Sequence, residues 1–595
     1  MRLVAPRENK EAEATARFLL PAWLRAFVRN RETGLVITGM LIGVISGVLV
    51  AAIGQLSQLA HVLLFDIPRD GHLSSTPVIS WQRIVFVPIA GGAVLAVLAL
   101  LFNNRLKGQL ADAIEANALL GGRLSMRGSI YVSLQTLVSN GFGGSVGLEA
   151  GYTQICSAIS SWFGRTLAAR RSDMRLLVAC GAAAAISAAF SAPLAGAFYA
   201  FEVILGAYTS ASLVSVIASA VCGWLVARSL THQAFLMVPG FPTPVSVEMV
   251  GQSVLIGVIC ALGSIGLMLA VAYAERAFQA LKFIPAAFRP ILGGAILGAM
   301  ALLTPVVLGA GHGAMQILLV SNPSWILLST AIVLKVLASA ISLGSGFRGG
   351  LFFASLLLGA LIGELYSVLA AMVIPDAAMQ PGTAAIAALA ALSSGVIGAP
   401  FAMVCLALEI TGDFSVTVGA IIASSVTALI VRELFGYSFA TWRFHLRGEV
   451  IRGPQDVGWT RQLSASSLMR TDFEVAPTFM LVAEAQAAFP LTTKQIVLRD
   501  QDGRYAGLVM AADLHAVSDA ADQKLEALAR QHDEFLLPHM NIREVTTAFE
   551  KTETDVLVVV DRSDRRVAIG TISEAYVLRT YSEELERRNQ EMFFR

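Results

Sequence analysis

The sequence is poor in charge. Asp, Glu, Lys and Arg make up 14% of its 595 residues, where an ordinary soluble domain carries about 25%. Several long runs contain none of these four residue types: 34–60, 84–102, 176–201, 249–274, 291–334 and 415–431. Many of them exceed the roughly 20 helical residues that cross a bilayer core, and they lack the polar face of a soluble helix. This pattern excludes a soluble globular protein and predicts a polytopic α-helical membrane protein.

The sequence also has few features of metal or catalytic chemistry. Its five cysteines lie in apolar stretches without a CxxC pair, so neither a zinc site nor a disulfide framework is expected. It contains no P-loop, dinucleotide fingerprint or nucleophile elbow. We therefore expect no enzyme activity, no metal and no cofactor. The net charge of +1 argues neither for nor against an anionic partner, and we expect no nucleic acid partner.

Basic residues flank the apolar part of the chain at both ends. Arg25, Arg29 and Arg31 lie shortly before the first run, and Arg443, Arg447 and Arg452 follow the last. Residues 231–247, by contrast, carry no Asp, Glu, Lys or Arg. Because cytoplasmic flanks are enriched in Lys and Arg, we expect a multi-pass protein of the inner (plasma) membrane with both termini in the cytoplasm. Residues 1–33 form the predicted cytoplasmic N-terminal segment.

Charge returns near residue 447, and the pattern changes there. The stretch "KQIVLRDQDGRYAGLVMAADLHAV" predicts a strand, an Asp-Gly turn, a strand and a helix. The stretch "DVLVVVDRSDRRVAIGTISEAYVL" repeats this order further along the chain. Two copies of one unit predict a single cytoplasmic α/β domain of paired repeats. We place a linker at 447–463 and this domain at 464–590.

The apolar part contains a repeat of its own. "SAPLAGAFYAFE" (191–202) and "GAPFAMVCLALE" (398–409) share an Ala-Pro pair and a glutamate at the same spacing. A glycine-rich break precedes each, "GGSVGLEAG" (143–151) and "GSGFRGGLFFAS" (344–355). Interrupted apolar segments at corresponding positions indicate an inverted-repeat transporter fold with its site at the midplane. The predicted membrane domain, 34–446, then has halves at about 34–235 and 245–446.

Glu149 is the only charged residue of the first glycine-rich break. The first N–H groups of a helix lack intrahelical partners and carry partial positive charge, and glycine lets the backbone approach a ligand closely. Two such helix starts that converge would bind an anion without a buried lysine. A carboxylate at this position can occupy the anion site and compete with a permeating anion, so Glu149 is the first functional candidate.

The order and spacing of these motifs resemble one family. The two breaks, the Ala-Pro motifs, "GAPFAMVCLALEITGDFS" and the paired C-terminal repeats resemble the CLC family of chloride channels and chloride/proton antiporters. The C-terminal pair resembles a tandem CBS domain. The resemblance covers roughly residues 34–590. It implies chloride transport across a lipid bilayer by a homodimer in which each subunit holds its own anion pathway.

The resemblance also implies roles for individual residues. Glu149 matches the external gating glutamate, which blocks the outer anion site until it swings away or is protonated. The anion-binding positions are backbone amides at the two breaks. They are Leu148 and Ala150 at the outer site, and Gly350, Leu351 and Phe352 at the central site.

Three positions depart from the family pattern. Gln109 stands where the family has an anion-contacting serine, although its carboxamide still offers N–H donors, and Ala440 stands where the family has a tyrosine. Val203 replaces the inner glutamate that takes up protons in antiporters. Because valine carries no proton, this favours passive anion conductance. The adjacent Glu202 leaves a proton route open, although we expect Glu202 and the equivalent Glu409 to be structural, as helix-end or dimer-side carboxylates.

CBS pairs often bind adenine nucleotides through the pattern Gly-x-(Ile/Val)-(Ser/Thr)-x-x-Asp. In "GLVMAAD" Asp513 is present but Met510 replaces the hydroxyl residue, and in "GTISEAY" Ser573 is present but Tyr576 replaces the aspartate. Neither copy is complete. Asp513 and Ser573 are therefore candidate nucleotide contacts, while a structural role of the pair at the dimer interface is favoured.

Three functions follow from the sequence. Chloride transport by a CLC-type, voltage-gated channel with Glu149 as its gate is favoured. A proton-coupled chloride antiporter is the first alternative. The second is a membrane sensor whose membrane part no longer conducts and whose CBS pair reads a ligand.

Overall fold

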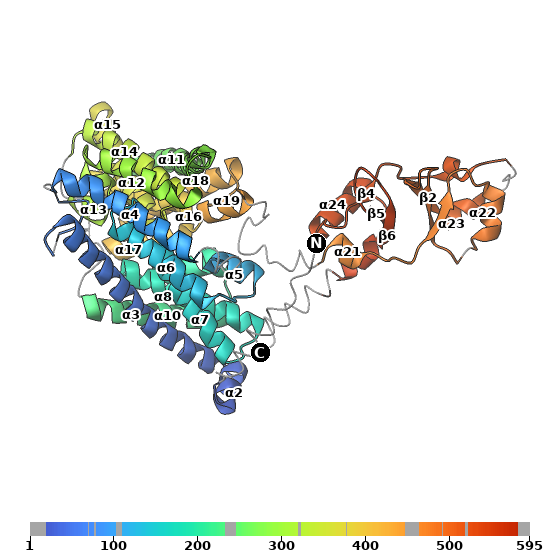
Figure 1. Ribbon diagram of the computed structural model, residues 1–595, viewed down its shortest axis with the longest axis horizontal. Helices are drawn as coiled ribbons and strands as arrows, with labels where there is room; N and C mark the ends of the chain where they lie inside the picture. Colours follow the sequence, from blue (N-terminus) through green and yellow to red (C-terminus); the bar gives the residue numbers. More distant parts are fainter. Residues whose placement is uncertain are drawn as a thin grey trace. The chain divides into compact units, whose positions relative to one another are not determined.

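The chain forms two compact units, Met1–Asp456 and Val457–Arg595. The computed structural model describes residues 20–69, 71–76, 79–102, 110–231, 245–318, 323–375, 378–446, 463–490, 492–517, 522–580 and 583. The division between the units falls within the predicted linker, 447–463. The first unit is helical and the second contains small sheets (Figure 1).

The helices of the first unit follow the order of the two predicted halves. The predicted N-terminal segment contains α2 (Ala22–Asn30), and the first half contains α3 (Glu32–Phe65), α4 (Trp81–Phe102), α5 (Ala113–Leu119), α6 (Met126–Gly141), α7 (Glu149–Thr166), α8 (Arg171–Phe190), α9 (Pro193–Tyr199), the π-helical turn η1 (Ala200–Leu205) and α10 (Ser210–Thr231).

The second half repeats this arrangement. It contains α11 (Val247–Ala280), η2 (Ala286–Phe288), α12 (Arg289–Ala301), η3 (Pro305–Val307), α13 (His312–Leu318), α14 (Trp325–Ser345), α15 (Phe352–Val373), α16 (Pro381–Ile397), α17 (Pro400–Thr411), α18 (Phe414–Leu434) and α19 (Phe439–Leu446). Across the described residues, eight helices are long and apolar enough to cross a membrane. The prediction of a polytopic helical membrane fold is confirmed.

The packing of the helices relates the two halves. Helix α3 packs against α10 as α11 packs against α18, and α7 packs against α8 as α15 packs against α16. Helices α9 and α17 contact each other across the two halves. Such reciprocal contacts are what a two-fold relation between repeats produces. Small residues allow close packing here, since a Cβ at Gly39 of α3 would lie 3.0 Å from the carbonyl oxygen of Ser215 in α10.

The second unit contains two sheets of the same design. Its strands are β1 (Glu474–Pro477), β2 (Gln495–Arg499), β3 (Tyr505–Met510), β4 (Phe535–Leu536), β5 (Val556–Val560) and β6 (Ala568–Ser573). Its helices are α21 (Ala465–Leu468), α22 (Val482–Ala488), α23 (Ala511–Ala516), η4 (Leu525–Leu528) and α24 (Ile542–Thr552). In each sheet the first strand is parallel to the second and the second is antiparallel to the third. The predicted paired repeats are present.

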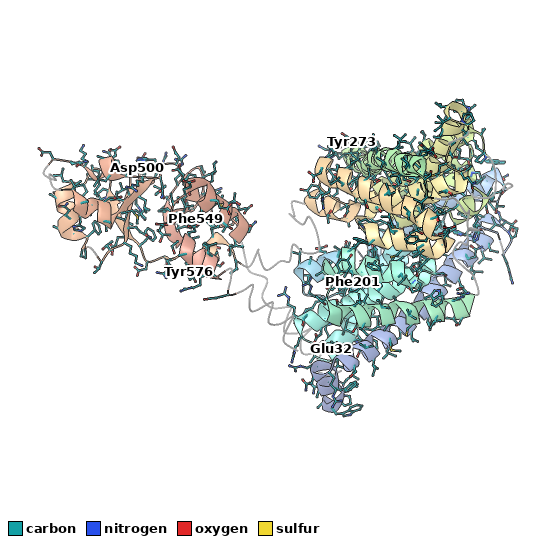
Figure 2. The ribbon with its side chains drawn as sticks, turned by 180° about the vertical axis from the view of Figure 1, so that it is seen from behind. Glu32, Phe201, Tyr273, Asp500, Phe549 and Tyr576 are labelled. Carbon is teal, nitrogen blue, oxygen red and sulfur yellow. The ribbon has the colours of Figure 1, made fainter. Side chains whose placement is uncertain are left out.

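Both units have buried apolar interiors. Phe201 in η1 and Phe549 in α24 are among the largest fully buried side chains of the described residues (Figure 2). In the second unit, Val497, Tyr505 and Val558 belong to one apolar cluster, so the two sheets pack together. In the first unit, the largely buried helix α7 begins at Glu149.

Candidate functional site

The two glycine-rich breaks lie against each other. The N–H of Gly147 donates to the carbonyl of Gly350 at 3.0 Å, and the N–H of Gly350 donates to the carbonyl of Gly147 at 3.1 Å. A helix begins two residues after each glycine, α7 at Glu149 and α15 at Phe352. The starts of two long helices, one from each half, therefore meet inside the first unit.

The carboxylate of Glu149 reaches from α7 to the start of α15. Glu149 is 6% exposed, and its Oε1 accepts a hydrogen bond from the N–H of Phe353 at 3.2 Å. Glycine leaves room for this contact, because a Cβ at Gly350 would lie 2.7 Å from Oε1 and a Cβ at Gly147 would overlap the same carboxylate. A carboxylate of one half thus occupies the helix start of the other half, where the helix dipole favours negative charge.

Two cavities adjoin the first turn of α7. The first, of about 350 Å³, is lined by α19 among other elements and is called the α19 cavity. The second, of about 520 Å³, is called the histidine cavity, because His61, His72 and His312 line it. Leu148 lines the histidine cavity and Glu149 lines the α19 cavity. Neighbouring residues at the start of α7 therefore line different cavities.

Most of the residues that the sequence singled out gather at the α19 cavity. Its wall includes Glu149, Ala150, Gly350, Leu351, Phe352, Val203 and Ala440. Leu148 lies on the side of the histidine cavity. Gln109 lies outside the described residues. The two described departures from the family pattern, Val203 and Ala440, thus face the same space as the predicted gate.

Asp112 is a site residue that sequence reasoning missed. It is the N-cap of α5, and its Oδ1 accepts a hydrogen bond from the N–H of Glu115 at 2.8 Å. The side chain of Asn117 donates to the carbonyl of Ile204 at 2.7 Å and so fastens α5 to η1. Asp112 consequently lines the α19 cavity. The signal in the sequence was an N-cap residue three positions before a glutamate.

Aromatic rings surround the start of α15. The ring of Phe352 stacks on Phe190 with centroids 4.4 Å apart, and the ring of Tyr199 lies 6.0 Å from Phe352. On the other side, the ring of His312 stacks on Phe353 at 3.8 Å. Tyr199 lines the α19 cavity and was also missed. It lies within "SAPLAGAFYAFE", but only the fold shows that it faces the same cavity as Glu149.

The histidine cavity contains one charged side chain. Arg69 lines it together with the three histidines, which are counted as neutral at pH 7, and none of the lining residues within the described ranges is Asp or Glu. The imidazole Nε2 of His61 lies 2.9 Å from the carbonyl oxygen of Asn140. Behind the wall, the fully buried Lys335 donates from Nζ to the carbonyl of Gly309 at 2.9 Å. An arginine without acidic neighbours favours anions in such a cavity.

Two equivalent glutamates cap helices of the opposite half. Glu202 accepts hydrogen bonds from the N–H groups of Phe401 and Ala402 at 3.2 and 2.9 Å. Glu409 accepts hydrogen bonds from the N–H groups of Leu194 and Ala195 at 2.8 and 2.9 Å. Each carboxylate therefore satisfies the first N–H groups of a helix that begins with proline. This geometry fits the structural role that we expect for both residues.

Replacing Glu202 or Glu409 with alanine is expected to destabilise the first unit. Each change removes two charge-assisted hydrogen bonds, so the free energy of unfolding should fall by about 2 kcal/mol. Thermal unfolding of the purified protein in detergent measures the effect. The matched control is Glu433→Ala, which alters an exposed carboxylate of α18. A Glu202→Ala or Glu409→Ala protein as stable as the control would contradict the capping role.

The candidate nucleotide contacts of the second unit occupy different environments. Asp513 lies in the first turn of α23, and its Oδ2 forms an ion pair with Nη2 of Arg530 at 3.0 Å. Ser573 ends β6. Tyr576 replaces the second aspartate, and the guanidinium groups of Arg470 and Arg579 lie 5.7 and 5.6 Å from its ring. The Asp513 carboxylate, which would contact the ribose of a bound nucleotide, is therefore already paired with Arg530.

Comparisons with known proteins agree with one another. A family model described as voltage gated chloride channel matches residues 91–432. A ClcB-like protein of Ralstonia nicotianae is 33% identical over 363 residues, which cover 60% of this chain and 83% of that protein. The voltage-gated ClC-type chloride channel ClcB of Shigella flexneri is 30% identical over 366 residues, covering 61% and 86%. A slow cyanobacterial Cl⁻/H⁺ antiporter of known structure, 21% identical, superimposes with a TM-score of 0.60 over 69% of this chain and 97% of that one.

Proposed function

The chain belongs to the voltage-gated chloride channel family, and from that membership we propose that it moves chloride across a membrane with the Glu149 carboxylate as the gate. One observation carries the gate assignment. Oε1 of Glu149 accepts the hydrogen bond of the Phe353 N–H at the start of α15. An anion that passes this point would need the same donor, so the carboxylate and the permeating anion exclude each other.

We propose that the two cavities form the path of the anion. Arg69 would attract anions to the histidine cavity, and the α19 cavity would receive them beyond the gate. Arg25 and Arg29 in α2 and Arg443 in α19 support a cytoplasmic position of both chain ends and of the α19 cavity, because cytoplasmic segments are enriched in arginine and lysine. We propose an inner (plasma) membrane location and a homodimer, in which each subunit has its own pathway.

The mode of transport follows from Val203. It lines the α19 cavity at the position where an antiporter of the family has its inner glutamate, so we propose passive chloride conductance. Coupled exchange with protons is the second candidate, because one observation favours it. Glu202 and Val203 both line a further cavity of about 500 Å³, which gives Glu202 contact with solvent.

Chloride efflux from liposomes tests the transport itself. Vesicles that contain the purified protein and an outward chloride gradient should release chloride once a potassium ionophore balances the charge, whereas protein-free vesicles should not.

The third function predicted from the sequence, a membrane sensor that does not conduct, gains no support from the relatives, whose names refer to chloride channels. Absence of efflux from folded protein would contradict chloride transport and would revive the sensor.

The second unit is expected not to bind adenine nucleotides. Asp513 is already paired with Arg530, and Tyr576 replaces the aspartate in the other copy. Added ATP or AMP should therefore leave the unfolding temperature of the protein unchanged, since only a ligand that binds the folded state raises it. Arg530→Ala serves as the matched variant, because it frees the Asp513 carboxylate. A rise in unfolding temperature of the unaltered protein with nucleotide would contradict this expectation.

A further inference from the structure

A further cavity, of about 310 Å³, shares part of its wall with the α19 cavity and is lined by three arginines. They are Arg289 at the start of α12, Arg348 between α14 and α15, and Arg443 in α19. We call it the arginine cavity. Among its lining residues within the described ranges, Glu275 of α11 is the one acidic residue. Three positive charges against one negative charge leave the wall with a net charge of +2.

Two of the arginines belong to both cavities. Gly346, with a φ of 114°, ends α14, and beyond this turn the N–H of Arg348 donates to Oγ of Ser139 at 2.8 Å. The guanidinium carbon of Arg443 lies 5.9 Å from the centre of the Phe439 ring. Arg348 and Arg443 line the arginine cavity and the α19 cavity alike. A ligand in the first cavity would therefore change the charge that the second one presents.

The third arginine lines the arginine cavity without lining the α19 cavity. Arg289 is the first residue of α12, and no side chain caps this helix start. Its Nε is shielded from solvent and has no hydrogen-bond partner among the described residues. A buried donor without an acceptor is unfavourable. Arg289 thus indicates an acceptor that the described part of the chain does not supply.

We propose that the arginine cavity binds a phosphate group, presented by the headgroup of an anionic phospholipid. Guanidinium groups pair with phosphate oxygens through two parallel hydrogen bonds, and the net charge of +2 favours such an anion. The end of α14 also lines the cavity, but a helix end contributes only about half a negative charge. The binding itself does not depend on the proposed chloride transport.

The segment between α11 and α12 favours a lipid as the source of the phosphate. The side chains of Phe283 and Phe288 are 80% and 42% exposed, and Lys282 beside them is exposed as well. Ala286 and Ala287 of the same segment line the arginine cavity. Exposed aromatic and basic side chains together are typical of a segment at a bilayer surface. Basic pockets between membrane helices are known to bind anionic headgroups.

Thermal unfolding of the full-length protein in a neutral detergent measures the binding, because a ligand of the folded state raises the unfolding temperature. Phosphatidylglycerol should raise this temperature in a saturable way. Phosphatidylcholine, whose headgroup has no net charge, should not. Inorganic phosphate is the third probe. Stabilisation by inorganic phosphate without stabilisation by phosphatidylglycerol would support the phosphate site and overturn the lipid as its source.

Three variants locate the site. Arg289→Gln should weaken the apparent affinity for phosphatidylglycerol at least about tenfold, because it removes a hydrogen bond between charged groups. The matched control is Arg276→Gln, which changes an exposed arginine of α11 that lies over the ring of Tyr273 and does not line the cavity. It should bind as the wild type does. Glu275→Gln should strengthen the binding severalfold, because it removes the carboxylate from the wall.

Two results with these variants would overturn the proposal. One is equal stabilisation of the wild-type and Arg289→Gln proteins by phosphatidylglycerol. The other is an equal loss of affinity in Arg289→Gln and Arg276→Gln, which would indicate unspecific attraction to a basic surface. If Arg289→Gln does not fold, Glu275→Gln decides, since an unchanged or weaker affinity would contradict an anion site next to this carboxylate.

A bound headgroup should also reduce chloride flux, because it neutralises the two arginines that the α19 cavity shares. This consequence rests on the proposed function. Flux from liposomes that contain phosphatidylglycerol should be severalfold lower than flux from phosphatidylcholine liposomes. Arg289→Gln should lose most of this difference and Arg276→Gln should keep it, whereas an equal difference in both would contradict the coupling. A wild-type protein without flux would contradict the proposed function alone, since the unfolding measurements still decide the binding.

Discussion

Replacing Glu149 with alanine is expected to raise the chloride flux at neutral pH roughly tenfold and to abolish its dependence on pH. The reason is competition at the start of α15, where the carboxylate occupies the N–H of Phe353. A charge at a partly buried helix N-terminus is stabilised by up to about 2 kcal/mol, which is more than a tenfold change in a two-state population. Efflux from liposomes at several pH values measures both effects.

Two further variants sharpen this test. Glu149→Gln keeps the size of the side chain but removes its charge, so its flux should also lose pH dependence. Glu115→Gln removes a different carboxylate from the wall of the α19 cavity and should retain the wild-type pH profile. A folded Glu149→Ala protein without chloride flux would show that Glu149 is needed for conduction and is not a gate.

Replacing Gly147 with alanine is expected to open the pathway while Glu149 is still present. The added Cβ would overlap the carboxylate of Glu149 in its contact with α15. Gly147 does not have a positive φ, so the backbone tolerates alanine, and the flexible end of the glutamate has to move. The closed position should lose most of its population, and basal chloride flux should rise roughly tenfold.

The control for this variant adds the same methyl group where nothing is displaced. Gly266 in α11 has open space around its Cβ position, so Gly266→Ala should leave the flux unchanged. In the double variant Gly147→Ala, Glu149→Ala, the second change should add little, because the carboxylate has already left the helix start. A Gly147→Ala protein with wild-type flux and pH dependence would mean that the observed Glu149 contact does not limit conduction.

The sequence predicted those features that depend on local patterns. Runs without charge predicted membrane helices because no polar face is available to water, and the fold contains them. Glycine-rich breaks predicted interrupted segments, and α7 and α15 begin two residues after Gly147 and Gly350. The paired motif at 191–202 and 398–409 predicted two related halves, which the reciprocal caps of Glu202 and Glu409 display.

Features that depend on distant contacts could not be predicted. No local pattern shows that the carboxylate of Glu149 crosses to the N–H of Phe353, 204 residues along the chain. Tyr199 reads as one more aromatic residue of an apolar helix until α9 is placed beside the α19 cavity. Asp112 begins a helix of only 7 residues, which is too short for a clear periodic signal, and comparison with the family motif drew attention to Gln109 instead.

The reversal potential in a pH gradient tests the central claim of gated passive conductance most directly. The purified protein is placed in a planar bilayer with a fixed chloride gradient, and the potential of zero current is recorded at equal pH and then with the two sides at different pH. The account predicts that the current changes with pH while the reversal potential stays at the chloride equilibrium value. A reversal potential that shifts with the pH gradient would contradict passive conductance and would establish coupled exchange of chloride and protons.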